Sequence, residues 1–84
     1  MPELILYYMP SCPFCQKVLS YMKKNDIEIP LKDTYSNRSY SQELLKIGGK
    51  TQVPCLVIDG KALYESDDII AWFKDNWKKA QQAW

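Results

Sequence analysis

Two cysteines, in the segment Cys12-Pro13-Phe14-Cys15, separate an apolar stretch from the start of a helical pattern. The stretch before them, Leu4 to Tyr8, is apolar or aromatic throughout, which is typical of a central strand covered on both faces. After them, apolar residues recur at helical spacing as far as Lys23-Lys24-Asn25, and Pro13 suits the first helical position because its missing N–H is not needed there. The cysteine pair is therefore predicted between a central strand and a helix, where open α/β sheets place their ligand sites.

The next segment, 27–32, alternates apolar with polar residues and predicts a half-buried strand. Pro30 lies inside this segment and cannot donate a ladder hydrogen bond, so the strand is confined to an edge of the sheet. After a polar loop, Ser39 with Gln42 three residues later predicts a capping box, which begins a short helix that runs to Gly48-Gly49.

The second half of the chain predicts a β-hairpin followed by a helix. The segments 55–58 and 61–64 flank Asp59-Gly60, a pair that readily takes the positive φ values of a two-residue turn. Ser66 is predicted to cap the last helix, and two aspartates in its first turn suit the positive end of the helix dipole. The apolar face of this helix carries Ile69, Phe73 and Trp77.

The resulting order is βαβαββα. We expect residues 1–84 to form one domain, because a chain this short buries only about 60% of its unfolded surface and cannot support two cores. Placing the two continuously apolar strands in the middle gives a four-stranded mixed sheet of order 2-1-3-4, with helices on both faces. The sequence therefore predicts an α/β fold.

Charge and composition argue against several classes of partner. Eleven Lys and Arg balance ten Asp and Glu, for a formal charge of +1, so no strong field attracts nucleic acid or an anionic membrane. The segment Met1 to Met9 lacks the features of a secretory signal, and no apolar run reaches the roughly 18 residues of a membrane span. An odd number of cysteines argues against a secreted disulfide scaffold. We expect a cytoplasmic protein that binds neither nucleic acid nor membrane.

The first cysteine, Cys12, is predicted to be a nucleophile. Unpaired N–H groups at the start of a helix stabilise thiolate over thiol, and the thiolate is the form that attacks disulfides. Cys15, one turn inside the helix, is expected to be more buried and to resolve a mixed disulfide on Cys12. The alternatives are a structural disulfide, two packed thiols or half of a zinc site. Within a monomer, three Cys and no His cannot supply the four ligands that a structural zinc site usually needs, although a dimer or carboxylate ligands could complete one. No metal is expected.

Three motifs together resemble the glutaredoxins over nearly the whole chain: Cys12-Pro13-Phe14-Cys15, Thr51-Gln52-Val53-Pro54 and Ser66-Asp67-Asp68. The resemblance implies a thioredoxin-like fold and a glutathione-dependent thiol-disulfide oxidoreductase. Its substrates would be protein disulfides and protein-glutathione mixed disulfides, with glutathione as co-substrate. We expect a monomer whose partners are glutathione and such disulfide-bonded or glutathionylated proteins.

The resemblance also implies a cis peptide bond before Pro54, with the backbone of Val53 pairing with the cysteine of glutathione like an added strand. Ser66 and Asp67 would hold the γ-glutamyl end, although capping alone would explain Ser66 equally well. Phe14 replaces the usual tyrosine and keeps its ring. Glutathione binding is thereby assigned to Cys12, Phe14, Lys50, Gln52, Val53, Pro54, Ser66 and Asp67.

The chain departs from the family pattern at the anchor for the glycyl carboxylate of glutathione. The family often has a lysine between the first strand and the cysteines, but Met9 occupies that stretch here. Lys50, Gln52 and Arg38 are the candidates that could replace it. The sequence leaves the choice among them open.

A second departure points to another family. Tyr64-Glu65 replaces the usual Gly-Gly pair, and Gln52-Val53-Pro54 with Glu65-Ser66 resembles the N-terminal domain of glutathione transferases. Such transferases carry a further all-helical domain, which 84 residues cannot contain, so transferase activity is the less favoured reading. Cys55 is interpreted as a small buried apolar residue rather than a redox group.

Two rival functions remain open. The first is a thioredoxin-like reductant that receives electrons from a flavoprotein reductase rather than from glutathione. The second is a carrier in which Cys12 of two chains and two glutathiones hold an iron-sulfur cluster. Within the family, that role is more usual where Pro13 is replaced and the second cysteine is missing.

Overall fold

The structure, a computed structural model, describes residues 3–77 of the chain. Its elements follow the predicted order βαβαββα. Their bounds are β1 Leu4–Tyr8, α1 Pro13–Lys24, β2 Leu31–Asp33, α2 Arg38–Gly48, β3 Cys55–Ile58, β4 Lys61–Tyr64 and α3 Ser66–Asn76. No helix within residues 3–77 has both the length and the apolar character that a membrane span requires.

The four strands form one mixed sheet of order β2-β1-β3-β4, as predicted. β1 runs parallel to β2 and antiparallel to β3, and β3 pairs antiparallel with β4. The turn between the last two strands has positive φ at both residues, 50° at Asp59 and 83° at Gly60. The strand order places β1 between β2 and β3, so β1 is a central strand, as predicted. The cysteine pair follows this central strand.

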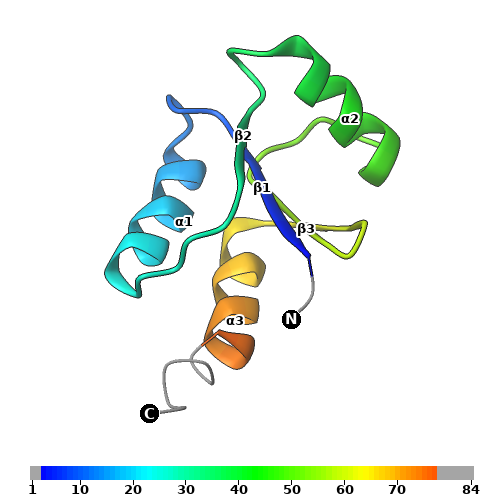
Figure 1. Ribbon diagram of the computed structural model, residues 1–84. Helices are drawn as coiled ribbons and strands as arrows, with labels where there is room; N and C mark the ends of the chain where they lie inside the picture. Colours follow the sequence, from blue (N-terminus) through cyan, green and yellow to red (C-terminus); the bar gives the residue numbers. More distant parts are fainter. Residues whose placement is uncertain (1–2, 78–84) are drawn as a thin grey trace.

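Each face of the sheet carries its own core, with α1 and α3 on one face and α2 on the other (Figure 1). The core under α1 and α3 consists of Leu4, Leu6, Val18, Met22, Ile27, Leu56, Ile69 and Phe73. The core under α2 consists of Tyr7, Leu44, Cys55 and Val57. Adjacent residues of β1 and of β3 enter opposite cores, because successive side chains of a strand point to opposite faces. This is why both strands are apolar throughout.

The edge strand β2 is shorter and begins later than predicted, covering Leu31–Asp33 rather than 27–32. Ile27 is only 5% exposed, but it belongs to the connection between α1 and β2 and not to a strand. Leu31, in contrast, is 45% exposed. Pro30 has no N–H to pair with β1, so the strand begins after it. The apolar alternation of 27–32 thus arose partly from a connection that packs on the core, and the predicted bounds of the strand are wrong. Its predicted position at the edge of the sheet is confirmed.

Both predicted helix caps are wrong by one or two residues. Asn37 caps α2, and its side-chain oxygen accepts from the Ser39 N–H at 3.0 Å, so Ser39 is inside the helix. Ser66 is the first residue of α3, because β4 ends at Tyr64 and Glu65, with a φ of 75°, redirects the chain in one residue. The Glu65 side chain makes no capping hydrogen bond, so no side chain from this position satisfies the first N–H groups of α3.

The end of α2 packs against β4 so closely that Gly48 has no room for a side chain. A Cβ at Gly48 would overlap the Tyr64 hydroxyl and lie 2.9 Å from the Ala62 Cβ. The same hydroxyl donates to the Lys50 carbonyl at 2.9 Å. These contacts fix the start of the loop that leads to Val53-Pro54.

Replacing Gly48 by alanine is expected to lower the free energy of unfolding by about 1–3 kcal/mol, because the added methyl group must displace Tyr64 or the end of α2. Urea denaturation of the two proteins measures the difference. The same substitution in a Tyr64→Ala background should cost clearly less, because the overlapping hydroxyl is absent. Equal losses in the two backgrounds would contradict this account of the contact.

Candidate active site

Cys12 occupies the N-cap position of α1, with extended backbone angles (φ −84°, ψ 121°). Its sulfur is half-buried and accepts a hydrogen bond from the Cys15 N–H at 3.4 Å. Burial alone would raise the pKa of the Cys12 thiol, but hydrogen bonds from the Cys15 N–H, the Cys15 thiol and the Phe14 N–H lower this pKa below its ordinary value. The thiolate, which is the attacking form, is therefore favoured at Cys12.

Cys15 has the opposite character, and the expectation that it is the more buried of the two is confirmed. Its exposure is 0%, and this burial raises the pKa of its thiol to about 12. The Met9 N–H donates to the Cys15 sulfur at 3.4 Å and offsets only part of the rise. The pair is reduced in this structure and combines one activated sulfur with one protonated sulfur beneath it.

The turn between β1 and α1 is held in place by backbone and side-chain hydrogen bonds. The Cys12 N–H donates to the Met9 carbonyl at 3.2 Å, and the Gln16 side chain donates to the Pro10 carbonyl at 2.7 Å. The Gln16 N–H donates in turn to the Cys12 carbonyl at 3.0 Å. The backbone of Cys12 is thus held on both sides, through its N–H and through its carbonyl.

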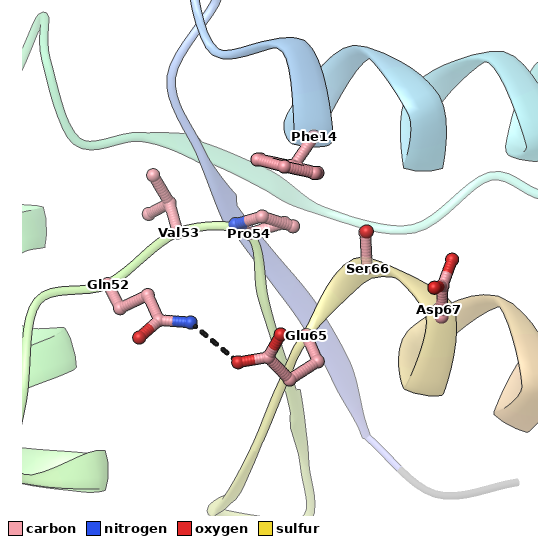
Figure 2. A pocket seen from close by; sticks show the side chains of 7 residues that line it. All are labelled: Phe14, Gln52, Val53, Pro54, Glu65, Ser66 and Asp67. Atoms are coloured by element: carbon pink, nitrogen blue, oxygen red, sulfur yellow. Dashed lines mark hydrogen bonds between the residues drawn. The ribbon is translucent and has the colours of Figure 1, made fainter.

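A pocket of ≈ 340 Å³ lies between the start of α1, the segment 52–54 and the start of α3 (Figure 2). Its size is within the range of small-molecule sites, about 300–1,000 Å³. The residues that line it are Phe14, Gln52, Val53, Pro54, Glu65, Ser66 and Asp67. All of them except Glu65 belong to the predicted glutathione-binding set, so the fold brings these distant residues together, although their role stays a prediction. Cys12 does not line the pocket; it is the N-cap of the helix whose first turn carries Phe14.

The segment 52–54, which precedes β3, has the backbone geometry that the family resemblance implied. The peptide bond between Val53 and Pro54 is cis, as the family resemblance implied. Both residues lie on the wall of the pocket that faces Phe14 (Figure 2). The side chain of Gln52 points along the same wall and donates to Glu65 Oε2 at 3.1 Å.

Glu65 is the pocket residue that the predicted binding set missed. Its signal was present in the sequence, because Glu65 stands where glutaredoxins usually have glycine and forms part of the transferase-like pair Glu65-Ser66. Its carboxylate and that of Asp67 give this side of the pocket negative charge. Asp67 is paired with the ammonium group of Lys17 on α1.

A second pocket of ≈ 350 Å³ is lined by Met9, Thr34, Tyr35, Arg38, Ser41 and Thr51. It adjoins the cysteine turn through Met9 and the first pocket through Thr51, which precedes Gln52. Arg38, a candidate anchor for the glycyl carboxylate, therefore lies in a pocket. Lys50 lines neither pocket; its ammonium group lies 4.6 Å from the centre of the Tyr64 ring.

Cys55, the third cysteine, lies in the core under α2 and is 0% exposed. Burial raises the pKa of its thiol to about 11. Its interpretation as a buried apolar residue agrees with this environment. Within residues 3–77, no three His, Cys, Asp or Glu side chains are grouped as ligands for a metal ion.

Comparison with known proteins relates the chain to two glutathione-linked groups. The sequence model of the family described as "Glutathione S-transferase, N-terminal domain" matches residues 6–80. Glutaredoxin 3 of Escherichia coli (strain K12) is 24% identical to this chain over 71 residues, which are 84% of this chain and 86% of that protein.

Solved structures show the same two resemblances. Glutathione transferase Omega 3C from Trametes versicolor has a TM-score of 0.77 and 29% identity, over 90% of this chain and 34% of the transferase. Oxidized glutaredoxin 2 from Chlamydomonas reinhardtii has a TM-score of 0.69 and 25% identity, over 98% of this chain and 82% of the other. The thioredoxin-like fold and the resemblance to glutaredoxins with transferase features are thereby confirmed, and this chain spans about a third of the length of the transferase.

Alkylation by iodoacetamide should modify Cys12 first. Its pH midpoint should fall below that of an ordinary thiol, because the hydrogen bonds at the helix start outweigh burial and lower its pKa. Cys15 and Cys55, with pKa values raised by burial to about 12 and about 11, should react only slowly at neutral pH. Mass spectrometry of the modified peptides measures each rate. Cys55→Ser should leave the fast phase intact and Cys12→Ser should remove it; a Cys12 midpoint at or above the ordinary thiol value would contradict the assignment.

Proposed function

The chain belongs to the glutathione S-transferase N-terminal domain family, and from this premise we propose that it is a glutathione-dependent thiol-disulfide oxidoreductase of the glutaredoxin type. The observation that carries the proposal is the Cys12 sulfur, half-buried at a helix start, with a pKa below its ordinary value and a protonated Cys15 beneath it. The glutaredoxin and transferase relatives support a glutathione-related redox function. We further propose that the chain acts as a single domain, as a monomer and in the cytoplasm.

Deglutathionylation would need Cys12 alone. The Cys12 thiolate attacks the glutathione sulfur of a protein-glutathione mixed disulfide, forming a new S–S bond as the old one breaks. The electron pair leaves on the protein sulfur, which takes up a proton. A second glutathione thiolate then attacks the glutathione sulfur held on Cys12, releasing glutathione disulfide and restoring the Cys12 thiolate.

Protein disulfides would need both cysteines. Cys12 attacks one sulfur of the substrate and forms a mixed disulfide, and Cys15 then loses its proton and attacks the Cys12 sulfur. The substrate leaves as a dithiol, and the resulting Cys12–Cys15 disulfide is reduced by two glutathiones. The position of Cys15 one turn along the helix, with its N–H 3.4 Å from the Cys12 sulfur, supports this intramolecular step.

Glutathione would bind with its γ-glutamyl end at the start of α3. The α-carboxylate there can accept from the first N–H groups of the helix and from the Ser66 hydroxyl, since no side chain from the cap position satisfies those groups. The α-ammonium would approach the carboxylates of Glu65 and Asp67. The backbone of Val53 would pair with the glutathione cysteine, and the exposed ring of Phe14 would cover it from the α1 side.

Among the candidates for the glycyl carboxylate, we favour Arg38. Lys50 is held over the Tyr64 ring and Gln52 is hydrogen-bonded to Glu65. Arg38, in contrast, lines the second pocket together with Thr51, at the end of the binding segment opposite to α3. Glutathione lying along Val53 would then have its glycyl carboxylate near a cation and its α-ammonium near carboxylates.

The decisive experiment measures glutathione-dependent reduction by the wild type and two cysteine variants, with glutathione reductase as the coupling enzyme. Cys12→Ser should lose all turnover, at least about a hundredfold, because it removes the nucleophile. Cys15→Ser should retain reduction of a glutathionylated protein but lose most reduction of a protein disulfide. Equal losses of both activities in Cys15→Ser would contradict the roles given to the pair.

Two further measurements separate the rival functions. Turnover with thioredoxin reductase but not with glutathione would favour the thioredoxin-like reductant. A coloured protein after anaerobic reconstitution with iron, sulfide and glutathione would favour the cluster carrier. Each result would count against the proposal.

The role of Arg38 can be tested on the same substrate. Arg38→Ala should raise the KM for glutathione about three- to tenfold, as expected for a lost charge-assisted contact of about 1 kcal/mol, and leave kcat nearly unchanged. The effect should vanish with the glycyl ethyl ester of glutathione, which has no carboxylate at that end. Lys46→Ala, which removes a charge from the last turn of the same helix, is the matched control. A larger KM change in Lys50→Ala than in Arg38→Ala would instead identify Lys50 as the anchor.

Conjugation of glutathione to an electrophile is a second candidate, which the match to the transferase family favours. This reaction uses the sulfur of glutathione and does not require a protein thiolate. Conjugation of a chloronitrobenzene that persists in Cys12→Ser would therefore support it.

A further inference from the structure

The two carboxylates at the start of α3 have different partners. Glu65 accepts from the neutral amide of Gln52 at 3.1 Å, whereas Asp67 is paired with the ammonium group of Lys17. In Figure 2 the Glu65 side chain is directed towards Gln52 and the Asp67 side chain towards α1. Within residues 3–77, Asp67 is the pocket carboxylate whose charge a cation already balances.

The cation comes from the helix that carries the cysteines. Lys17 lies on α1, five positions after Cys12, and its pair with Asp67 joins the two helices that cover one face of the sheet. The two side chains are 52% and 80% exposed, so solvent reaches both. Exposed ion pairs are weak and are screened by salt, so this pair can open readily when another cation is offered.

We propose that Lys17 is a specificity-determining residue that acts through Asp67. In the free protein its ammonium group occupies the Asp67 carboxylate, and the α-ammonium of the γ-glutamyl group takes its place when glutathione binds. This inference rests on the proposed function, because it concerns the ligand of the same pocket. Lys17 itself need not touch the ligand.

The exchange has a consequence for which ligands bind well. A ligand with an ammonium group must displace Lys17, so part of its attraction to Asp67 is spent on opening the existing pair. A ligand without that ammonium group leaves the pair closed and is indifferent to Lys17. Lys17 therefore lowers the advantage that the α-ammonium gives to glutathione and permits its ready release.

The test compares Lys17→Met with the wild type at low ionic strength, where the pair is strongest. The KM for glutathione should fall about two- to fivefold, which is the range expected for an exposed ion pair, while kcat is retained. The fall should shrink at high salt. It should also be absent for glutaryl-cysteinyl-glycine, which is glutathione with hydrogen in place of the amino group, and absent in an Asp67→Asn background. Lys24→Met, which removes the same charge from the far end of α1, should leave the KM unchanged.

Three results would overturn the inference. These are an unchanged or raised KM in Lys17→Met, an equal fall in the Asp67→Asn background, and an equal fall for the analogue without the amino group. In each case, glutathione turnover by the wild type would leave the proposed function standing. A wild-type protein without any glutathione turnover would overturn the proposed function and this inference with it.

Discussion

The chemistry of the site depends on the hydrogen bonds that the first turn of α1 gives to one sulfur. The Cys12 sulfur is partly withdrawn from water, which by itself favours the neutral thiol, and the N–H groups of the helix start reverse that preference. Cys15, three residues further on, receives one N–H from Met9 and full burial, and burial prevails there. The same residue type thus has two chemical characters within one helical turn.

The surroundings of this sulfur are polarised along the segment that leads to Pro54. Carboxylates and uncapped N–H groups lie at the α3 end, and Arg38 lies at the other end beside Thr51. A zwitterionic peptide with a free carboxylate at its far end matches this arrangement in one direction only. The formal charge of +1 gives no hint of it, because the opposing charges nearly cancel over the whole chain.

Much of the fold follows from local rules that act within a few residues. Continuous apolarity identified the two central strands, and Asp59-Gly60 identified the hairpin, because each pattern suits few other structures. The bounds of the edge strand were wrong because Ile27, in the connection after α1, is buried. An alternating apolar pattern does not distinguish a buried residue of a connection from one of a strand. Glu65 was indicated only by the transferase-like pair Glu65-Ser66, and the pairing of Lys17 with Asp67 depends on how α3 meets α1, which no local pattern contains. The cis bond before Pro54 came only from the family resemblance, since an isolated Val-Pro reads as extended backbone.

The β3–β4 hairpin joins two walls of the first pocket. Cys55 pairs with Tyr64 at the end of the ladder. Pro54, which precedes Cys55, and Glu65, which follows Tyr64, therefore both lie just beyond this pair. The spacing between the strand-like wall and the start of α3 is therefore set within one short, continuous piece of chain, whereas the reactive sulfur arrives on a different helix. The hairpin thus sets the distance between these two walls independently of α1, whereas α1 contributes Phe14 to the third wall together with the reactive sulfur.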